Sequence, residues 1–201
     1  MNISKFFRSI IHKNLKGFTV NTKEKNMYRL YKARTSHLKW VNNIKLLVSG
    51  FSIDKKQLTP LVQDSEFGEW FYNEAKQFAQ FNSKNVLDEM EILLDEMYNI
   101  FTKIYSIYFG KEKGSLKTFL GFKDTASKYE VEFATRCYED IVVLSDKFKN
   151  RFGVLERQLL ALGDEKHEMV KVFESEEEML LRKSIPVDEI SDNYYHGPRS
   201  H

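Results

Sequence analysis

Two long stripes of apolar residues at helical spacing are the strongest constraint on the fold of this chain. Each stripe places an apolar side chain every three or four residues, the repeat of a buried helix face. Only three prolines and nine glycines are spread over 201 residues, so little interrupts long helices. The sequence therefore predicts an all-α fold. The stripes consist of Val86, Leu87, Met90, Leu93, Leu94, Met97, Ile100, Phe101, Ile104 and Tyr108, and of Phe133, Cys137, Ile141, Leu144, Phe148, Phe152, Leu155, Leu159 and Leu162.

Two further helices are predicted before these stripes. Residues 27–49 repeat apolar positions up to Gly50, a natural helix stop, and residues 52–64 read as a loop. Asp64 or Ser65 is placed to cap the next helix, which continues to Phe81. Asn82–Ser83 and Ser127 precede the third and fourth helices, and Gly163 follows the last. We expect an antiparallel four-helix bundle whose last helix is the longest and extends past its neighbours. The predicted first-helix stripe is Leu30, Tyr31, Arg34, His37, Leu38, Val41, Ile44 and Val48, and the second-helix face is Phe67, Phe71, Ala75, Phe78 and Phe81.

An extra amphipathic helix is predicted at the N-terminus. Phe6, Phe7, Ile10 and Ile11 fall on one face of residues 1–18, and most of the basic residues fall on the other. Such a helix fits the protein's own bundle, a protein partner or a membrane surface. The predicted organisation is residues 1–26 as this helix and a connector, 27–163 as the bundle, and 164–201 as an acidic, loosely ordered tail.

Charge and cysteine content exclude several classes of protein. The net charge is only +2, with six basic residues against one acidic residue in 1–25 and ten acidic against four basic in 164–192. No basic stripe alternates with exposed aromatics, so the sequence gives no case for nucleic-acid binding. The single cysteine, Cys137, excludes an internal disulfide framework. With no apolar run near 18 residues and no secretory signal, we expect a cytoplasmic protein.

The common catalytic signatures are absent from the sequence. It contains no glycine-rich phosphate loop, no G-x-S-x-G, no H-E-x-x-H and no paired cysteines. Cys137 lies on an apolar stripe, which favours a buried structural thiol over a nucleophile. We therefore expect a protein that is not an enzyme.

The residues from Ala33 to Tyr72 carry a family resemblance. A-R-T-S-H-L-K-W on the first helix is followed by an apolar run ending at Gly50 and then by E-F-G-E-W-F-Y, which opens the second. This pattern resembles the chemoreceptor zinc-binding (CZB) domain, a small four-helix bundle of bacterial chemoreceptors and diguanylate cyclases. The resemblance covers roughly residues 28–108. It makes His37 the counterpart of the family's first-helix zinc ligand, and its motif positions here are Trp40, Ser65, Phe67, Gly68 and Trp70.

The zinc ligands of that family are mostly missing here. Ser65 stands where the family has a cysteine, Glu69 replaces the usual basic residue, and the third helix has no histidine. Only carboxylates, among them Glu91 and Asp95 at spacing i, i+4, stand where the family's histidine pair is expected. Zinc needs three or four converging protein donors.

Two interpretations of this region stay open. In the first, the site has decayed, no cofactor is bound, and His37 is hydrogen-bonded or ion-paired to a third-helix carboxylate, which would raise its pKa. In the second, His37, Glu91 and Asp95 hold zinc. Gly68 is expected to permit close approach of another helix.

The resemblance implies a non-enzymatic bacterial signalling or adaptor protein of chemotaxis or motility type, which acts through protein partners. A metal-binding sensor and a structural component of a larger assembly are the alternatives. The long last stripe also indicates a homodimer.

Overall fold

The computed structural model describes residues 22–110 and 126–170, and these residues form helices and connecting turns without a strand. The prediction of an all-α fold is thereby confirmed. None of the described helices is long and apolar enough to cross a membrane. The elements are α2 (Thr22–Val48), η1 (Lys55–Gln57), η2 (Val62–Asp64), α3 (Glu66–Asn73), η3 (Ala75–Phe81), α4 (Lys84–Phe109), α6 (Lys128–Ala161) and α7 (Asp164–Glu168), where η marks a 3₁₀-helix.

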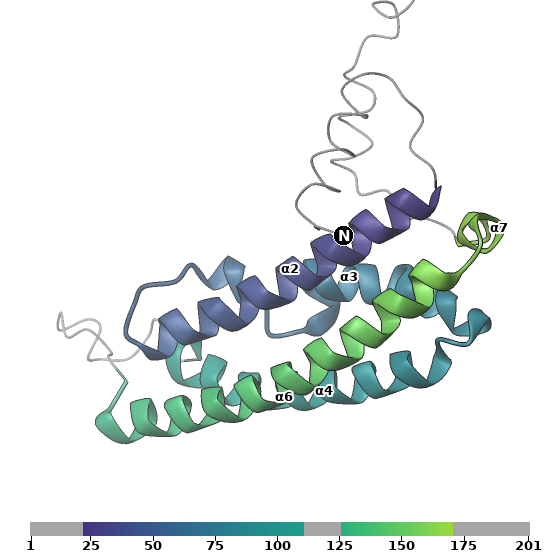
Figure 1. Cartoon of the computed structure of the whole chain (residues 1–201). Helices are drawn as coiled ribbons and strands as arrows, with labels where there is room; N and C mark the ends of the chain where they lie inside the picture. Colours follow the sequence, from purple (N-terminus) through teal and green to yellow (C-terminus); the bar gives the residue numbers. More distant parts are fainter. Residues whose placement is uncertain (1–21, 111–125, 171–201) are drawn as a thin grey trace, which may run out of the picture.

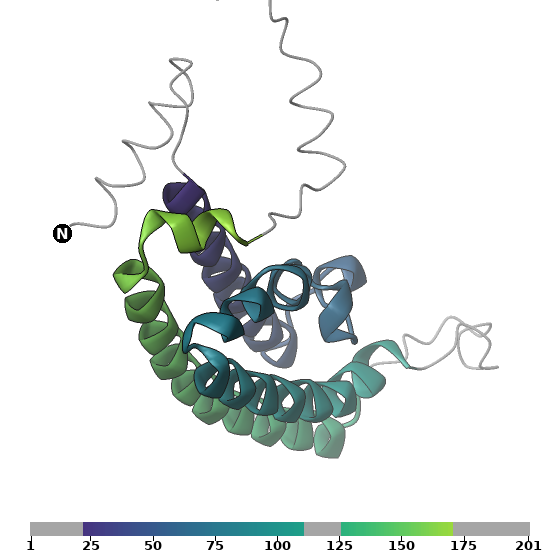
Figure 2. The same ribbon diagram turned by 90° about the vertical axis from the view of Figure 1, so that its right-hand side faces the viewer.

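Helices α4 and α6 run side by side and form one layer of the molecule (Figures 1 and 2). Helices α2 and α3, with the 3₁₀ turns, pack on one side of this pair. The core lies between the two layers. Its largest fully buried side chains are Phe71, Phe101, Phe148, Phe152, Ile44, Leu58, Leu87, Met90, Leu94, Met97, Ile104 and Ile141.

Helix α6 follows its sequence pattern closely. Ser127 is its N-cap, and a capping box joins the Ser127 hydroxyl to the Glu130 amide while the Glu130 carboxylate accepts from the Ser127 amide. Most of the predicted stripe is buried, but Phe133 is 46% exposed because the neighbouring Ala134 takes the inward position. Its 34 residues span about 51 Å.

The buried stripe of α2 is rotated from the predicted one. Ala33, Trp40 and Leu47 face the core, whereas Tyr31 and Leu38 are about 40% exposed. Val41, which was also predicted on this stripe, is only partly buried against the core. The prediction was right for Leu30, His37, Ile44 and Val48, which are buried.

The second predicted helix is shorter than expected. The α-helical part ends at Asn73, and Ala75–Phe81 is a 3₁₀-helix. Between them Glu74 is buried and accepts hydrogen bonds of 2.7 Å from Arg29 Nε. Because a buried carboxylate needs a cationic partner, this ion pair joins the break in the helix to α2. The predicted loop before α3 likewise contains the two turns η1 and η2.

Helices of the structure cross one predicted boundary and lie beyond the other. Helix α2 begins at Thr22 rather than residue 27, and α7 lies beyond residue 163. Asn26 and His167, assigned to the connector and the tail, are both buried. Asn26 Nδ2 donates to His167 Nδ1 at 3.2 Å, and His167 Nε2 donates to the Leu159 carbonyl at 3.0 Å. The two side chains share a buried hydrogen bond, while Asn26 Oδ1 has no partner among the described residues.

Candidate functional site

His37 was the leading candidate for a functional residue. It lies on α2 and its side chain is buried in the core, facing α6. Its side chain is 3% exposed and is surrounded by aromatic rings. The ring of Phe148 is 4.6 Å away between centroids, and those of Trp40 and Phe67 are each 6.0 Å away. The imidazole therefore sits in an environment that disfavours a charged form.

The hydrogen-bond partner of His37 is Ser145 on α6. His37 Nε2 and Ser145 Oγ are 3.0 Å apart, and Ser145 is itself 2% exposed. Burial, with a smaller contribution from the positive charge of Lys149, lowers the pKa of His37 to about 3. The expected pairing with a carboxylate and the expected rise in pKa were both wrong, because the neutral imidazole is held by a hydroxyl.

The proposed carboxylate ligands lie apart from His37. Glu91 is ion-paired with Lys76 of η3, with Oε1 and Nζ 2.5 Å apart, and Asp95 is exposed. Within residues 22–110 and 126–170, no three His, Cys, Asp or Glu side chains are grouped so that they could hold a metal ion. The structure does not bring His37, Glu91 and Asp95 together, and these residues do not fit a zinc ion.

Ser65 has a structural role at the start of α3. It is the N-cap of α3, where its Oγ accepts from the Gly68 amide at 2.9 Å. The same hydroxyl donates to the Val62 carbonyl at 2.6 Å. The prediction of Ser65 as a cap is confirmed, and its oxygen is engaged in holding η2 against α3.

Gly68 is needed where η2 approaches α3. A Cβ atom at this position would lie 1.8 Å from the Val62 carbonyl oxygen. The close neighbour is thus the backbone of the short 3₁₀-helix η2 that precedes α3.

The aromatic motif residues are core residues. Trp40 stacks on Tyr98 at 4.7 Å and 10°, and Trp70 stacks on Phe152 at 5.8 Å. Phe67 contacts both Trp70 and His37. The Trp40 indole N–H finds no hydrogen-bond partner among the described residues. Cys137 is also buried, as predicted, and burial raises the pKa of its thiol.

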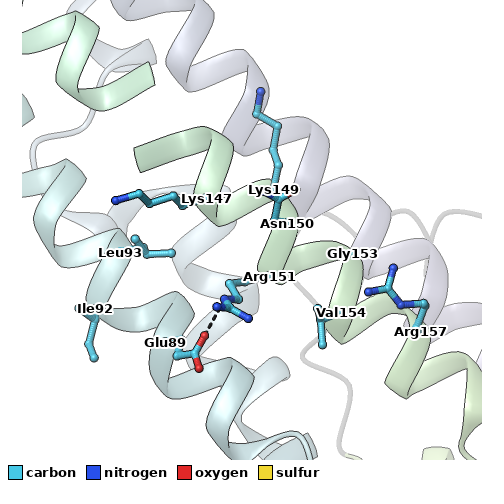
Figure 3. A pocket seen from close by; sticks show the side chains of 10 residues that line it. All are labelled: Glu89, Ile92, Leu93, Lys147, Lys149, Asn150, Arg151, Gly153, Val154 and Arg157. Carbon is cyan, nitrogen blue, oxygen red and sulfur yellow. Dashed lines mark ion pairs between the residues drawn. The ribbon is translucent and has the colours of Figure 1, made fainter. Parts of the chain in front are cut away.

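A groove of about 630 Å³ lies between α4 and α6 and was not predicted (Figure 3). Its apolar part comprises Ile92, Leu93 and Val154, and four basic residues line it: Lys147, Lys149, Arg151 and Arg157. Glu89 is its single acidic residue and pairs with Arg151, with Oε2 and Nε 2.6 Å apart. The groove therefore combines apolar surface with net positive charge.

The groove is part of a wider surface, which we call the outer face. On α4 it consists of Asp88, Glu89, Ile92 and Glu96, and on α6 of Val143, Lys147, Arg151, Val154 and Arg157. Ile92 is 59% exposed and Val143 is 58% exposed. Tyr129 and Phe133, 83% and 46% exposed, lie in the same helical phase of α6 as Val143 and Lys147.

A second periodicity of α6 could have identified this surface from sequence. Apolar residues at 129, 133, 143 and 154 share a face with basic residues at 147 and 151, beside the core stripe. The stronger core stripe obscures this signal. The predicted partner-binding residues Phe6, Phe7, Ile10 and Ile11 lie outside the described residues.

A comparison of this chain with known protein families, with characterised proteins and with solved structures finds no significant match.

Proposed function

We propose that this chain is a non-enzymatic signalling or adaptor protein that works by protein–protein contact through its outer face. The observation that carries the proposal is the exposure of Ile92 and Val143 beside a groove lined by basic residues. Large apolar side chains that share one face with charged ones are typical of partner-binding surfaces.

The resemblance to CZB domains supplies the proposed setting. The quoted motifs, and the position of His37 on the helix before F-G-x-W, support an antiparallel four-helix bundle of CZB type that has lost its zinc ligands. On this proposal the protein acts in bacterial chemotaxis or motility. Fold likeness alone is a weak warrant for function, so the outer face carries more weight.

Site-specific photocross-linking in the native host tests the proposal. A photoreactive amino acid replaces Ile92 at the centre of the outer face, and a matched protein carries it at the exposed Lys39 of α2. We expect a discrete protein adduct at position 92 and a much weaker one at position 39. Equal labelling at both positions, or no adduct at position 92, would count against a binding role for the outer face.

A deletion of residues 1–18 tests the separate docking role of the N-terminal segment. If that segment binds a partner, the set of proteins recovered with the full chain should lose members in the deletion variant. An unchanged set would remove that role and leave the outer face as the proposed site.

A further inference from the structure

The two halves of the outer face carry opposite charge. On α4, Asp88, Glu89 and Glu96 are exposed around Ile92. On α6, Lys147, Arg151 and Arg157 are exposed around Val154. An acidic strip therefore runs beside a basic strip, with apolar residues in both. Within one protomer Asp88 pairs with Lys84 and Glu89 pairs with Arg151.

Opposite strips on one face make that face complementary to itself. We propose that the outer face is the interface of a symmetric homodimer, in which α4 of one protomer lies on α6 of its partner. This inference rests on the proposed function, since it names the partner of the same surface as a second copy of this chain.

Symmetry selects one arrangement of the two copies. The Glu89–Arg151 pair shows that these residues lie at the same level of the antiparallel helices α4 and α6. A two-fold axis parallel to the helices leaves the position of each residue along the helix direction unchanged. It also swaps the sides of the two strips, so the acidic strip of α4 in one protomer faces the basic strip of α6 in its partner. An axis perpendicular to the helices would place each strip on its own copy, where like charges repel.

The available surface matches the size of a stable interface. The 26 residues of α4 span about 39 Å, and two adjacent helices are about 20 Å wide, which gives about 800 Å² per protomer. Standard protein–protein interfaces bury about this area on each partner. At the centre, Ile92 would move from solvent to apolar contact, and the ion pairs would surround it.

Charge reversal tests the proposed dimer. The variants are Glu96→Lys and Lys147→Glu, whose exposed side chains lie within one helical turn of each other's level. In a symmetric interface each reversal acts twice, so we expect each single variant to weaken dimerisation about tenfold or more. The double variant restores opposite charges and should recover dimerisation to within about threefold of the wild type. Lys39→Glu, on α2, is the matched control and should have no effect.

Sedimentation velocity on the full chain at about 1–100 µM gives the readout. A dimer of twice the 23.8 kDa chain mass, which weakens at high salt, is expected for the wild type. Thermal melts followed by circular dichroism check that every variant is folded. A monomer at all concentrations would overturn the proposal, as would single variants that dimerise like the wild type or a double variant without recovery.

The failure of this inference is separable from the failure of the proposed function. A monomeric protein that still forms a position-92 adduct with a different protein in the host overturns the dimer and keeps the adaptor function. A monomer without any adduct overturns both. A position-92 adduct of twice the chain mass supports both.

Discussion

At the scale of single residues, His37 links the fold to pH. Its folded pKa of about 3 lies below the usual 6.5, because burial disfavours the imidazolium. The unfolded chain therefore binds a proton that the folded chain does not bind between these pH values, and the free energy of unfolding falls as pH drops below about 6.5. Burial also lowers the pKa of His167, which adds in the same direction.

The variant His37→Gln isolates this contribution. On lowering the pH from 7 to 5, we expect the free energy of unfolding to fall by about 2 kcal/mol more in the wild type than in His37→Gln. Urea denaturation at both pH values measures this, and the carboxylates contribute equally to both proteins. Identical pH dependence in the two proteins would show that His37 is not a buried neutral side chain.

The sequence predicted that His37 faces the core but did not predict its hydrogen-bond partner. Helical periodicity indicated a core-facing position, and this is confirmed. Its partner Ser145 is 108 residues away and is a small polar residue inside an apolar stripe. No local pattern marks such a residue as a hydrogen-bond partner, whereas charged residues on another helix are evident from the sequence alone.

At the scale of elements, two glycines that both lie within helices, Gly68 and Gly153, are expected to respond in opposite ways to substitution. A Cβ atom at Gly68 would meet the Val62 carbonyl oxygen at 1.8 Å, while at Gly153 in α6 its nearest neighbour would be the flexible Arg157 side chain at 3.9 Å. We expect Gly68→Ala to destabilise the protein by about 1–3 kcal/mol through displacement of η2 from α3. Gly153→Ala should stabilise it by roughly 0.5–1 kcal/mol, the usual gain in a helix interior.

Chemical denaturation of the two alanine variants beside the wild type checks this pair. Equal effects of the two substitutions would mean that the close contact between η2 and α3 is absent in solution. The sequence indicated that Gly68 marks a close approach of another helix, but it did not identify η2 as that neighbour. A turn formed by Val62–Asp64 has no periodicity by which it could be recognised in advance.

Helix ends show a similar limit of prediction. Ser127, Ser65 and Gly50 marked their boundaries well, because capping and left-handed glycine are local properties. Thr22–Asn26 and α7 were missed because polar composition resembles a solvated connector. They are ordered by contacts between segments 141 residues apart, which composition does not report.

At the scale of the whole molecule, α7 closes the end of the helical body. His167 is fully buried, contacts the ring of Phe78 at 5.7 Å and hydrogen-bonds to α2 and α6. Val170 is also buried. This short segment therefore joins three parts of the chain that the predicted boundary at residue 163 would have separated.

Two truncations test this closure. A chain that ends after Gly163 should lose about 2–4 kcal/mol of unfolding free energy, because it loses two buried side chains and leaves Asn26 without its partner. A chain that ends after Val170 keeps these contacts and should stay within about 1 kcal/mol of the full protein. Denaturant unfolding of the two truncated chains and the full protein gives the comparison. If both truncations had the same stability as the full chain, α7 would be an appendage and the boundary predicted from composition would be the correct one.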